Sequence, residues 1–450
     1  MSKSWPRMKL ADCVELLSGY AFKSQYFTNK PDDIALVKGE NVSQGHVLWE
    51  ISKRWPAVAW NELEKFKLRV GDVVIAMDRP WVPAGLKWCF IRQGDPKSFL
   101  VQRCCRLRSN PMLVDQSFLR FVIGGPSFEG YIKPITTGVN VPHISGGQIL
   151  NFEIEIPPLP VQRRIAGILS AYDELIENSQ RRIRLLEDMA RALYREWFIH
   201  FRFPRDPSEV LAKEAGNEPA PRPAPKRSGS ADTPLVPSPL GNIPQGWEVK
   251  TLDKVTTKVG SGATPRGGKG AYHAEGINLI RSLNIYDYQF EFDDLAFIND
   301  EQAAQLDNVT VQAHDVLLNI TGASVCRCAM VPSYLLPARV NQHVAIIRAD
   351  ARCMDPHYLL DTINNDYNKQ KLLGLAQGGA TREALTKETI CNFPILVPPR
   401  ELLTRYGQVA GVIHAQRETL QRRNQNLRST RDLLLPRLLS GQVALASVPA

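Results

Sequence analysis

Long apolar runs are missing from this 450-residue sequence, and cysteine is sparse. No stretch reaches the roughly eighteen apolar residues of a membrane-spanning helix, so none is expected. The N-terminal segment also lacks the apolar core of a signal peptide. The eight cysteines include Cys104-Cys105 and the C-x-C of Cys326 and Cys328, but no C-x-x-C pair of a zinc site. We therefore expect reduced, buried cysteines in a cytoplasmic protein that contacts no membrane.

Motifs for common chemistry are missing as well. The nearest approach to a phosphate loop, GATPRGGKG at 262–270, has Gly268 where that loop requires lysine. The proline pairs at 155–158 and 396–399 lack the polar and aromatic neighbours of an amino-methyltransferase motif. The histidines show no metal-binding spacing, and no carboxylates cluster with a lysine as in a nuclease. We predict no catalytic residue, no metal and no cofactor in this chain.

Proline and glycine are nearly absent from one long stretch, residues 157–203. After its opening prolines it has a single glycine, Gly167, and an apolar residue about every 3.5 positions. That period predicts a coiled-coil seam, in a helix of about 60 Å at 1.5 Å per residue. The predicted seam positions are Ile165, Leu169, Tyr172, Ile176, Ser179, Ile183, Leu186, Ala190, Leu193 and Trp197. Such a helix needs a partner of similar length.

An internal repeat supplies that partner. Five blocks of the first half recur in the second half at offsets between 240 and 244, placing Asp72 against Asp315 and NFEIEIPPLPVQRRIAGI at 151–168 against NFPILVPPRELLTRYGQV at 392–409. A second long helix therefore runs from about Arg400 to Leu439, with Pro436 expected to kink or end it. Its predicted seam is Tyr406, Val409, Ile413, Gln416, Leu420, Arg423, Leu427, Thr430 and Leu434. Polar seam residues, Ser179 in one helix and Gln416 or Arg423 in the other, are expected to fix the register.

The resulting prediction is an α/β chain with two tandem globular domains. The two long helices separate them, pair antiparallel as a coiled coil, and make the monomer pseudo-two-fold symmetric. Nine prolines between Pro204 and Pro239 indicate a tether. The predicted segments are domain 1 at 1–156, the first helix at 157–203, a linker at 204–241, domain 2 at 242–397, and the second helix with a tail at 398–450.

Two similar domains on a rod suit the reading of two DNA half-sites, which lie about 34–36 Å apart when separated by one turn of the duplex. A net charge of +9 permits a polyanionic partner. Exposed basic or aromatic loop residues are the candidate DNA contacts, although an ordinary solvated charge is the alternative for each. They are Lys38, Arg79, Trp81, Lys87, Arg92 and Lys133 in domain 1, and Arg266, Lys269, Arg281, Arg327, Arg339 and Arg382 in domain 2. The pairs Lys38/Arg281 and Asn41/Asn284 recur in both copies, which favours phosphate-positioning or structural roles for them.

Lysine is absent from both long helices, which use arginine alone as their cation. Arginine suits bidentate carboxylate and phosphate contacts, and a GC-rich genome explains the bias equally well.

Four segments together resemble one family, the specificity subunits of Type I restriction-modification enzymes. They are the Pro-Pro entry PPLPVQRRIAGILSAYDELIE, the helix exit LYREWFIHFRFP, the restart GNIPQGWEVKTL, and the C-terminal RDLLLPRLLSGQV. The resemblance covers nearly the whole chain. One departure is that the family's Glu-Gln after the entry prolines is only partly kept, as Val161-Gln162 and Glu401-Leu402.

The resemblance implies a bacterial or archaeal host-defence protein that binds double-stranded DNA. Each domain would be a target recognition domain for half of a bipartite sequence, and the helices would be spacers that dock two methyltransferase subunits. Those partners would carry S-adenosylmethionine and methylate adenine, while separate motor-nuclease subunits would use ATP and Mg²⁺. Two other readings stay open. One is a coiled-coil scaffold without DNA binding, and the other is an enzyme with a fused activity, which is disfavoured because no segment is left to hold a catalytic domain.

Overall fold

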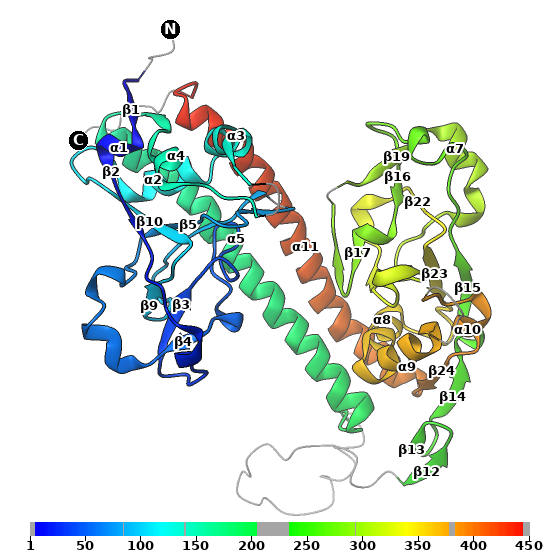
Figure 1. Cartoon of the computed structure of the whole chain (residues 1–450). Coiled ribbons are helices and arrows are strands. Elements are labelled where there is room, and N and C mark those ends of the chain that lie inside the picture. Colours follow the sequence, from blue (N-terminus) through cyan, green and yellow to red (C-terminus); the bar gives the residue numbers. More distant parts are fainter. Residues whose placement is uncertain are drawn as a thin grey trace, which may run out of the picture. The chain divides into compact units, whose positions relative to one another are not determined.

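The computed structural model describes residues 5–83, 85–138, 141–204, 234–292, 294–377 and 383–443. The chain forms two compact units. Unit 1 comprises Met1–Asn178 and Arg423–Ala450, and unit 2 comprises Ser179–Arg422. Each unit contains one α/β part and one half of each long helix, as the colours along the chain show (Figure 1).

Unit 1 is built on two small sheets. The first is antiparallel with strand order β2-β10-β5-β8, and the second has the order β4-β3-β9 with β3 and β9 parallel. The strands of both sheets are β2 (Val14–Ser18), β10 (Cys104–Ser109), β5 (Val73–Ala76), β8 (Trp88–Phe90), β4 (Arg54–Trp55), β3 (Ile34–Val37) and β9 (Ser98–Leu100). All four residues of β3 and of β5 are buried, because these apolar runs are covered on both faces.

Shorter elements complete unit 1. They are the strand pair β1 (Arg7–Lys9) and β11 (Glu153–Glu155), the hairpin β6 (Trp81–Val82) and β7 (Gly85–Leu86), and helices α1 (Leu10–Cys13), α2 (Gln116–Ile123), α3 (Pro126–Ile135) and α4 (Gly146–Leu150). Asp115 begins α2 by accepting hydrogen bonds from the backbone N–H groups of Ser117 and Phe118.

Unit 2 repeats the two sheets with the same strand orders, β15-β23-β20-β21 and β19-β16-β22, and again with one parallel pair, β16 and β22. These strands are β15 (Thr256–Ser261), β23 (Val344–Ala349), β20 (Val316–Asn319), β21 (Cys328–Met330), β19 (Ala296–Ile298), β16 (Ile277–Ile280) and β22 (Ala338–Val340). The repeat predicted from the sequence is therefore confirmed at the level of topology.

The remaining elements of unit 2 follow the order of unit 1 only in part, because the hairpin of unit 2 lies between β16 and β19 in the chain whereas β6 and β7 lie between β5 and β8. They are the pair β14 (Glu248–Thr251) and β24 (Pro394–Val397), the hairpin β17 (Ile285–Tyr286) and β18 (Gln289–Phe290), and helices α7 (Asp300–Gln305), α8 (Pro356–Asn364), α9 (Asp366–Gln377) and α10 (Lys387–Cys391). An extra hairpin, β12 (Leu235–Ser238) with β13 (Gly241–Pro244), occupies the end of the predicted linker, so that part is not a tether. The linker residues 205–233 lie outside the described residues.

Repeated contacts explain why both copies fold alike. The Asp72 carboxylate accepts two hydrogen bonds from Arg108, at 2.6 and 2.7 Å, and Asp315 accepts two from Arg348, at 2.7 and 2.8 Å. The side chain of Asn41 bonds the backbone N–H of Lys38, and Asn284 bonds that of Arg281 in the same way. Both asparagines are fully buried, which assigns them the structural role left open by the sequence.

In each unit a glycine lies where two backbone segments pass very close to each other. A Cβ atom on Gly19 would lie 2.2 Å from the carbonyl oxygen of Val101, and one on Gly262 would lie 2.1 Å from that of Val340. No side chain fits such a distance, so each glycine lets two backbone segments meet.

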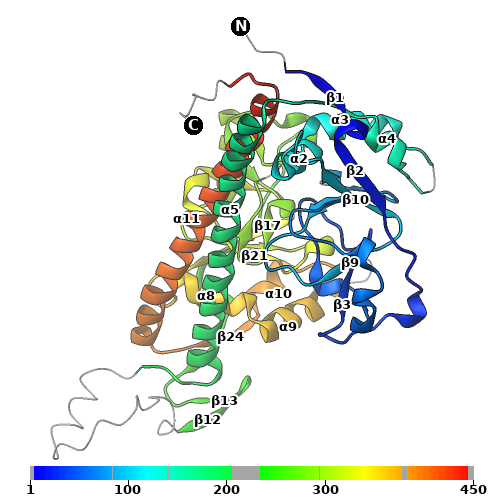
Figure 2. The ribbon, with the colours of Figure 1, turned by 90° about the vertical axis from the view of Figure 1, so that its left-hand side faces the viewer.

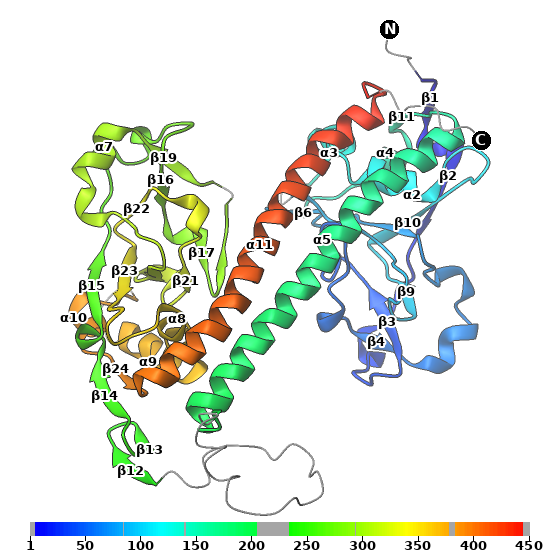
Figure 3. The ribbon, with the colours of Figure 1, turned by 180° about the vertical axis from the view of Figure 1, so that it is seen from behind.

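The long helices are α5 (Leu159–Tyr194), which continues into a π-helical turn at Arg195–Ile199, and α11 (Arg400–Leu439), which runs on past Pro436. Within each unit their halves run in opposite directions. In unit 1 Arg431 Nη1 lies 2.8 Å from Asp173 Oδ1, and Figure 2 shows α2 beside the N-terminal half of α5. In unit 2 the rings of Tyr194 and Tyr406 are 6.4 Å apart, and Figure 3 shows the N-terminal half of α11 beside α8.

The seam predicted for α5 lies on its inner face. Ile165, Leu169, Ile176, Ser179, Ala190 and Trp197 are buried, and Tyr172, Ile183, Leu186 and Leu193 are half-buried. The seam predicted for α11 is right only at every second position, where Tyr406, Ile413 and Leu420 are buried and Leu427 and Leu434 half-buried.

The other predicted positions of α11 are wrong. Val409 is 45% exposed, and Gln416, Arg423 and Thr430 are exposed as well. The stripe passes instead through the residues that follow them, Ala410, Arg417, Asn424 and Arg431. Ser179 is the buried polar seam residue that was expected in α5, whereas in α11 Arg417 and Asn424 take the place of Gln416 and Arg423.

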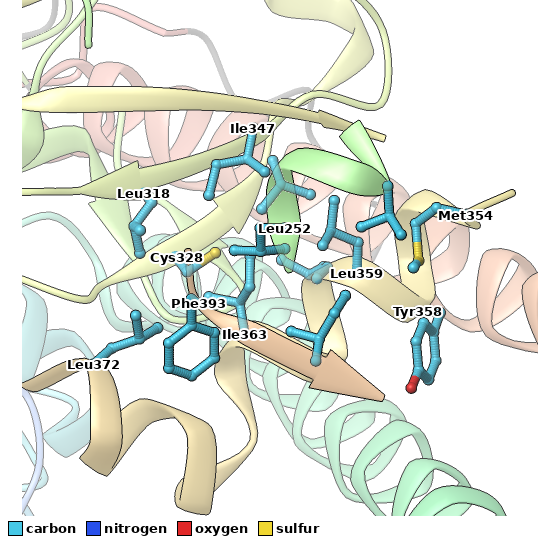
Figure 4. Close-up of a cluster of buried hydrophobic side chains, with 14 of the residues drawn as sticks. Leu252, Leu318, Cys328, Ile347, Met354, Tyr358, Leu359, Ile363, Leu372 and Phe393 are labelled. Carbon is cyan, nitrogen blue, oxygen red and sulfur yellow. The ribbon is translucent and has the colours of Figure 1, made fainter. Parts of the chain in front are cut away.

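One hydrophobic core cluster of unit 2 lies between its four-stranded sheet, α8 and α9. Figure 4 shows Leu252, Leu318 and Ile347 pointing toward Leu359, Ile363 and Phe393. Cys328 belongs to this cluster, and six of the eight cysteines are buried, with the other two half-buried and none paired in a disulfide. In the described part of the chain, no helix is long and apolar enough to cross a membrane.

Candidate nucleic-acid interface

Four loops of unit 1 meet where the strands of the two sheets end. Met77, just after β5, donates its backbone N–H to the carbonyl of Arg103 at 2.8 Å and accepts one from Ile144 at 2.8 Å. Val101, just after β9, donates to Val37 at the end of β3, at 3.0 Å. We call residues 38–46, 77–87, 101–103 and 136–145 loop cluster 1. Residues 84, 139 and 140 of this cluster lie outside the described residues.

Unit 2 builds the same junction from equivalent backbone atoms. Ile320 donates to the carbonyl of His343 at 3.0 Å and accepts from Leu385 at 2.8 Å, and Asn341 donates to Ile280 at 3.0 Å. We call residues 281–291, 320–327, 341–343 and 383–386 loop cluster 2. The two clusters share one backbone scaffold.

Side chains at equivalent positions of that scaffold differ. In loop cluster 1, Asp78 Oδ2 lies 3.2 Å from Arg103 Nε, and Asp78 Oδ1 lies 2.5 Å from His143 Nδ1. In loop cluster 2 the position of Asp78 is taken by Thr321, whose Oγ1 lies 2.7 Å from His343 Nδ1. Both Asp78 and Thr321 form a backbone bridge to the fourth loop, with His143 and Ala384 respectively. The two loop clusters therefore share a backbone and differ in the side chains that it carries.

None of these residues was a candidate in the sequence. The alignment of LVQRCCRL at 100–107 with VNQHVAII at 340–347 does place Arg103 opposite His343. That correspondence, with different side chains inside a well-aligned block, was the available signal.

The candidates predicted in domain 1 fall in or beside loop cluster 1, but their side chains differ in exposure and in the partners that they contact. Arg79 is exposed, with a left-handed backbone at φ 46°. Lys133 is exposed on α3, and its Nζ lies 5.8 Å from the ring centroid of half-buried Trp81. The ammonium of Lys38 pairs with Glu40 at 2.7 Å. The ammonium of Lys87 donates to the carbonyl of Gly39, and burial lowers its pKa, so Lys87 holds the 38–46 loop in place.

Of the candidates predicted in domain 2, only some lie in loop cluster 2. The guanidinium of Arg327 lies 4.3 Å from the ring centroid of Tyr286, which is 40% exposed. Arg281 donates to the backbone carbonyl of Asp294 and lies over the ring of Tyr272. Arg266 is exposed on the 263–276 loop. Arg382 and the side chain of Lys269 lie outside the described residues.

Two predicted contacts are corrected by the structure. Arg339 is only 8% exposed and donates hydrogen bonds to the carbonyls of Ala303 and Ala338, because its strand β22 faces the interior. Arg92 pairs with Glu177 of α5 at 2.9 Å, which ties the α/β part of unit 1 to its helix. Neither arginine is presented for a base contact.

Comparisons with known proteins agree with this architecture. A family model described as Type I restriction modification DNA specificity domain matches residues 2–188. The Type I restriction enzyme EcoAI specificity subunit of Escherichia coli is 31% identical over 177 residues, which cover 39% of this chain and 29% of that subunit. The HindI specificity subunit of Haemophilus influenzae is 21% identical over 455 residues, covering 93% of this chain and 95% of the subunit. A crystal structure of the Type-I restriction-modification system S subunit from M. genitalium shares the fold, with a TM-score of 0.60, 13% identity, and coverage of 98% and 97%.

Proposed function

The chain belongs to the specificity subunits of Type I restriction-modification systems, and from this premise we propose how it recognises DNA. Each unit reads one half of a bipartite double-stranded target through its loop cluster. The long helices fix the distance between the halves and dock two methyltransferase subunits. S-adenosylmethionine is bound by those partners, and ATP and Mg²⁺ by the motor-nuclease subunits, so this chain directs the chemistry without performing it.

One observation carries this proposal. Loop clusters 1 and 2 keep the same backbone hydrogen bonds while exchanging Asp78 for Thr321 and Arg103 for His343. A scaffold that only supported the fold would have no reason to place an arginine–carboxylate pair in one copy and a hydroxyl–imidazole contact in the other. Sequence readout requires different donors and acceptors at equivalent places, because each base pair presents its own pattern in the major groove.

The helices fit a spacing and docking role. With 36 residues in α5 and 40 in α11, they are about 54 and 60 Å long. Large apolar side chains remain exposed on them in positions one helical turn apart. Leu185 and Met189 of α5 are 62% and 56% exposed, and Val409 and Val412 of α11 are 45% and 58% exposed. Such apolar pairs favour the binding of partner subunits along the helices.

The central experiment is co-expression of the chain with its methyltransferase subunits, followed by sequencing of methylated adenines. We expect a bipartite motif that disappears when this chain is omitted. A complex that forms but shows no salt-dependent DNA affinity and no motif would overturn the proposal, and would favour the scaffold without DNA binding.

A second experiment separates spacing from reading. Inserting seven residues into α5 after Asn178 and seven into α11 after Arg422 keeps the 3.5-residue repeat in phase. Each insertion adds about 10 Å of helix, so we expect the gap to grow by about 3 bp while both half-sites stay unchanged. A changed half-site with an unchanged gap would mean that the helices read bases.

A further inference from the structure

Arg103 is an exposed cation of loop cluster 1. It occupies the turn between β9 and β10 with a left-handed backbone at φ 67°, and its side chain is 71% exposed. Residues other than glycine adopt this backbone rarely, and such strain is concentrated at functional sites. The turn therefore presents a long cationic side chain to solvent from a backbone conformation that is unfavourable for residues other than glycine.

Asp78 forms an ion pair with this side chain. Its Oδ2 atom lies 3.2 Å from Arg103 Nε, on the inner edge of the guanidinium. Its Oδ1 atom lies 2.5 Å from His143 Nδ1, so both carboxylate oxygens have a partner. Asp78 is only 24% exposed and is bridged through its backbone to His143, which anchors the carboxylate. Within the described residues, no hydrogen bond engages the two terminal nitrogens of Arg103, which remain available to a ligand.

The chemistry of this arrangement suits a base edge better than a phosphate. Two parallel N–H donors match the O6 and N7 acceptors of guanine in the major groove, the commonest arginine contact in DNA recognition. A phosphate would instead meet the carboxylate of Asp78 just behind the guanidinium and would be repelled by it. Arg79 and Lys133, whose charges have no ion-pair partner in the described structure, are better placed for phosphates.

The equivalent turn in unit 2 lacks this arginine. His343 stands in its place, with Nδ1 against Thr321 Oγ1 and Nε2 3.3 Å from the side-chain amide nitrogen of Gln342. A guanidinium fork is thus offered at this scaffold position by unit 1 alone. The readout at this position must differ between the two half-sites.

We propose that Arg103 reads a guanine in the half-site recognised by unit 1, with Asp78 and His143 as positioning residues. This inference rests on the proposed function. It identifies the base class that one side chain selects and leaves the half-site of unit 2 to other residues.

The test uses the complete complex with its methyltransferase subunits and compares methylated motifs by adenine-methylation sequencing. We expect Arg103→Ala to relax one guanine of one half-site, with discrimination falling on the order of 10- to 100-fold. Arg103→Lys retains the charge without the fork and should relax the same position. Asp78→Asn should relax that position more weakly, because the fork is then less firmly directed.

The matched control is Arg79→Ala, which removes a neighbouring exposed arginine with a left-handed backbone and should leave the guanine requirement intact. The unchanged half-site of unit 2 reports that each variant is folded and assembled. The inference is overturned if Arg103→Ala weakens methylation equally at all sequences, or if the variant complex still requires every base of the wild-type motif. A wild-type complex without any bipartite motif would instead refute the proposed function itself.

Discussion

The two units differ where their shared scaffold meets the long helices. In unit 1 this junction is mostly apolar, with Ile165 and Leu169 fully buried against the core that contains α2, and its buried Gln162 has a fully hydrogen-bonded side-chain amide. Its charges stay at the edge, where Asp173 pairs with Arg120 at 3.2 Å and Arg431 at 2.8 Å. The repeat offset of 241 places Tyr406, His414 and Arg417 of unit 2 opposite Ile165, Asp173 and Ile176.

The junction of unit 2 is a buried polar network. Tyr406 donates to Asp361 Oδ2 at 2.5 Å, and His414 Nε2 lies 3.3 Å from the same oxygen. Arg417, 6% exposed, lies over the ring of Tyr288, and Glu187 and then Asp361 attract its charge most strongly. In the described structure, Asp361 Oδ1, His414 Nδ1 and Arg417 Nε have no hydrogen-bond partner. One scaffold thus tolerates both an apolar and a polar junction, but the polar one depends on each partner, because an unpaired buried group is costly.

Removing Asp361, which lies at the centre of the network, should affect unit 2 more strongly than the matched change affects unit 1. We expect Asp361→Ala to destabilise unit 2 by about 3–5 kcal/mol, because it leaves Tyr406 and His414 buried without their shared acceptor and removes one of the carboxylates that compensate the buried charge of Arg417. The matched change in unit 1, Asp173→Ala, removes a partly exposed partner and should cost about 1 kcal/mol. Hydrogen exchange in the full chain measures both, through protection of α8 in unit 2 and of α2 in unit 1. Equal losses in the two units would contradict the difference between the junctions.

The stability of unit 2 should also depend on acidic pH in a way that the stability of unit 1 does not. Burial and, after it, the nearby His414 lower the pKa of His357 to about 4, whereas a histidine in an unfolded chain titrates near 6.5. Between these values the unfolded chain binds a proton that the folded unit does not, so stability falls as the pH falls. We expect a loss of roughly 1–2 kcal/mol for unit 2 between pH 7 and pH 5.

The position equivalent to His357 in unit 1 is Ser117, which does not titrate in this range. Exchange protection of unit 2, followed from pH 7 to pH 5, therefore reports the histidine. The His357→Gln variant should remove most of this pH dependence. An unchanged slope in that variant would assign the effect to another group.

The sequence predicts the architecture well because local signals and the repeat agree. The alternation of short strands, the proline-bounded long helices and the matched Asp72 and Asp315 each appear in the structure as expected. Contacts between distant segments were not visible in the same way. Which loops meet depends on the parallel pairing of β3 with β9, and the loop residue Arg103 was missed for that reason.

The error in the α11 seam has a related cause. A search for apolar residues selects Val409, whereas the true stripe passes through polar residues such as Arg417 and Asn424. The charge of Arg417 is compensated by Glu187 of α5 and, after it, by Asp361 of α8, both far away in the sequence. The internal repeat predicts the observed stripe, since adding the offset of 241 to Leu169 and Ile176 gives Ala410 and Arg417. Internal symmetry was the better guide where hydrophobicity failed.

The smallest expected effect tests that corrected seam. Val409→Gln should change the stability of the free chain by no more than about 0.5 kcal/mol, because this side chain is exposed. Ala410→Gln should cost about 1–3 kcal/mol, since Ala410 is fully buried beside Tyr406 and a larger polar side chain does not fit there. Urea unfolding of the free chain compares the two directly, without any contribution from partner subunits that bind the exposed face. If Val409→Gln lowered the free energy of unfolding more than Ala410→Gln, the seam first predicted would be correct. The assignment of Arg417 and Asn424 to the buried stripe would then be wrong.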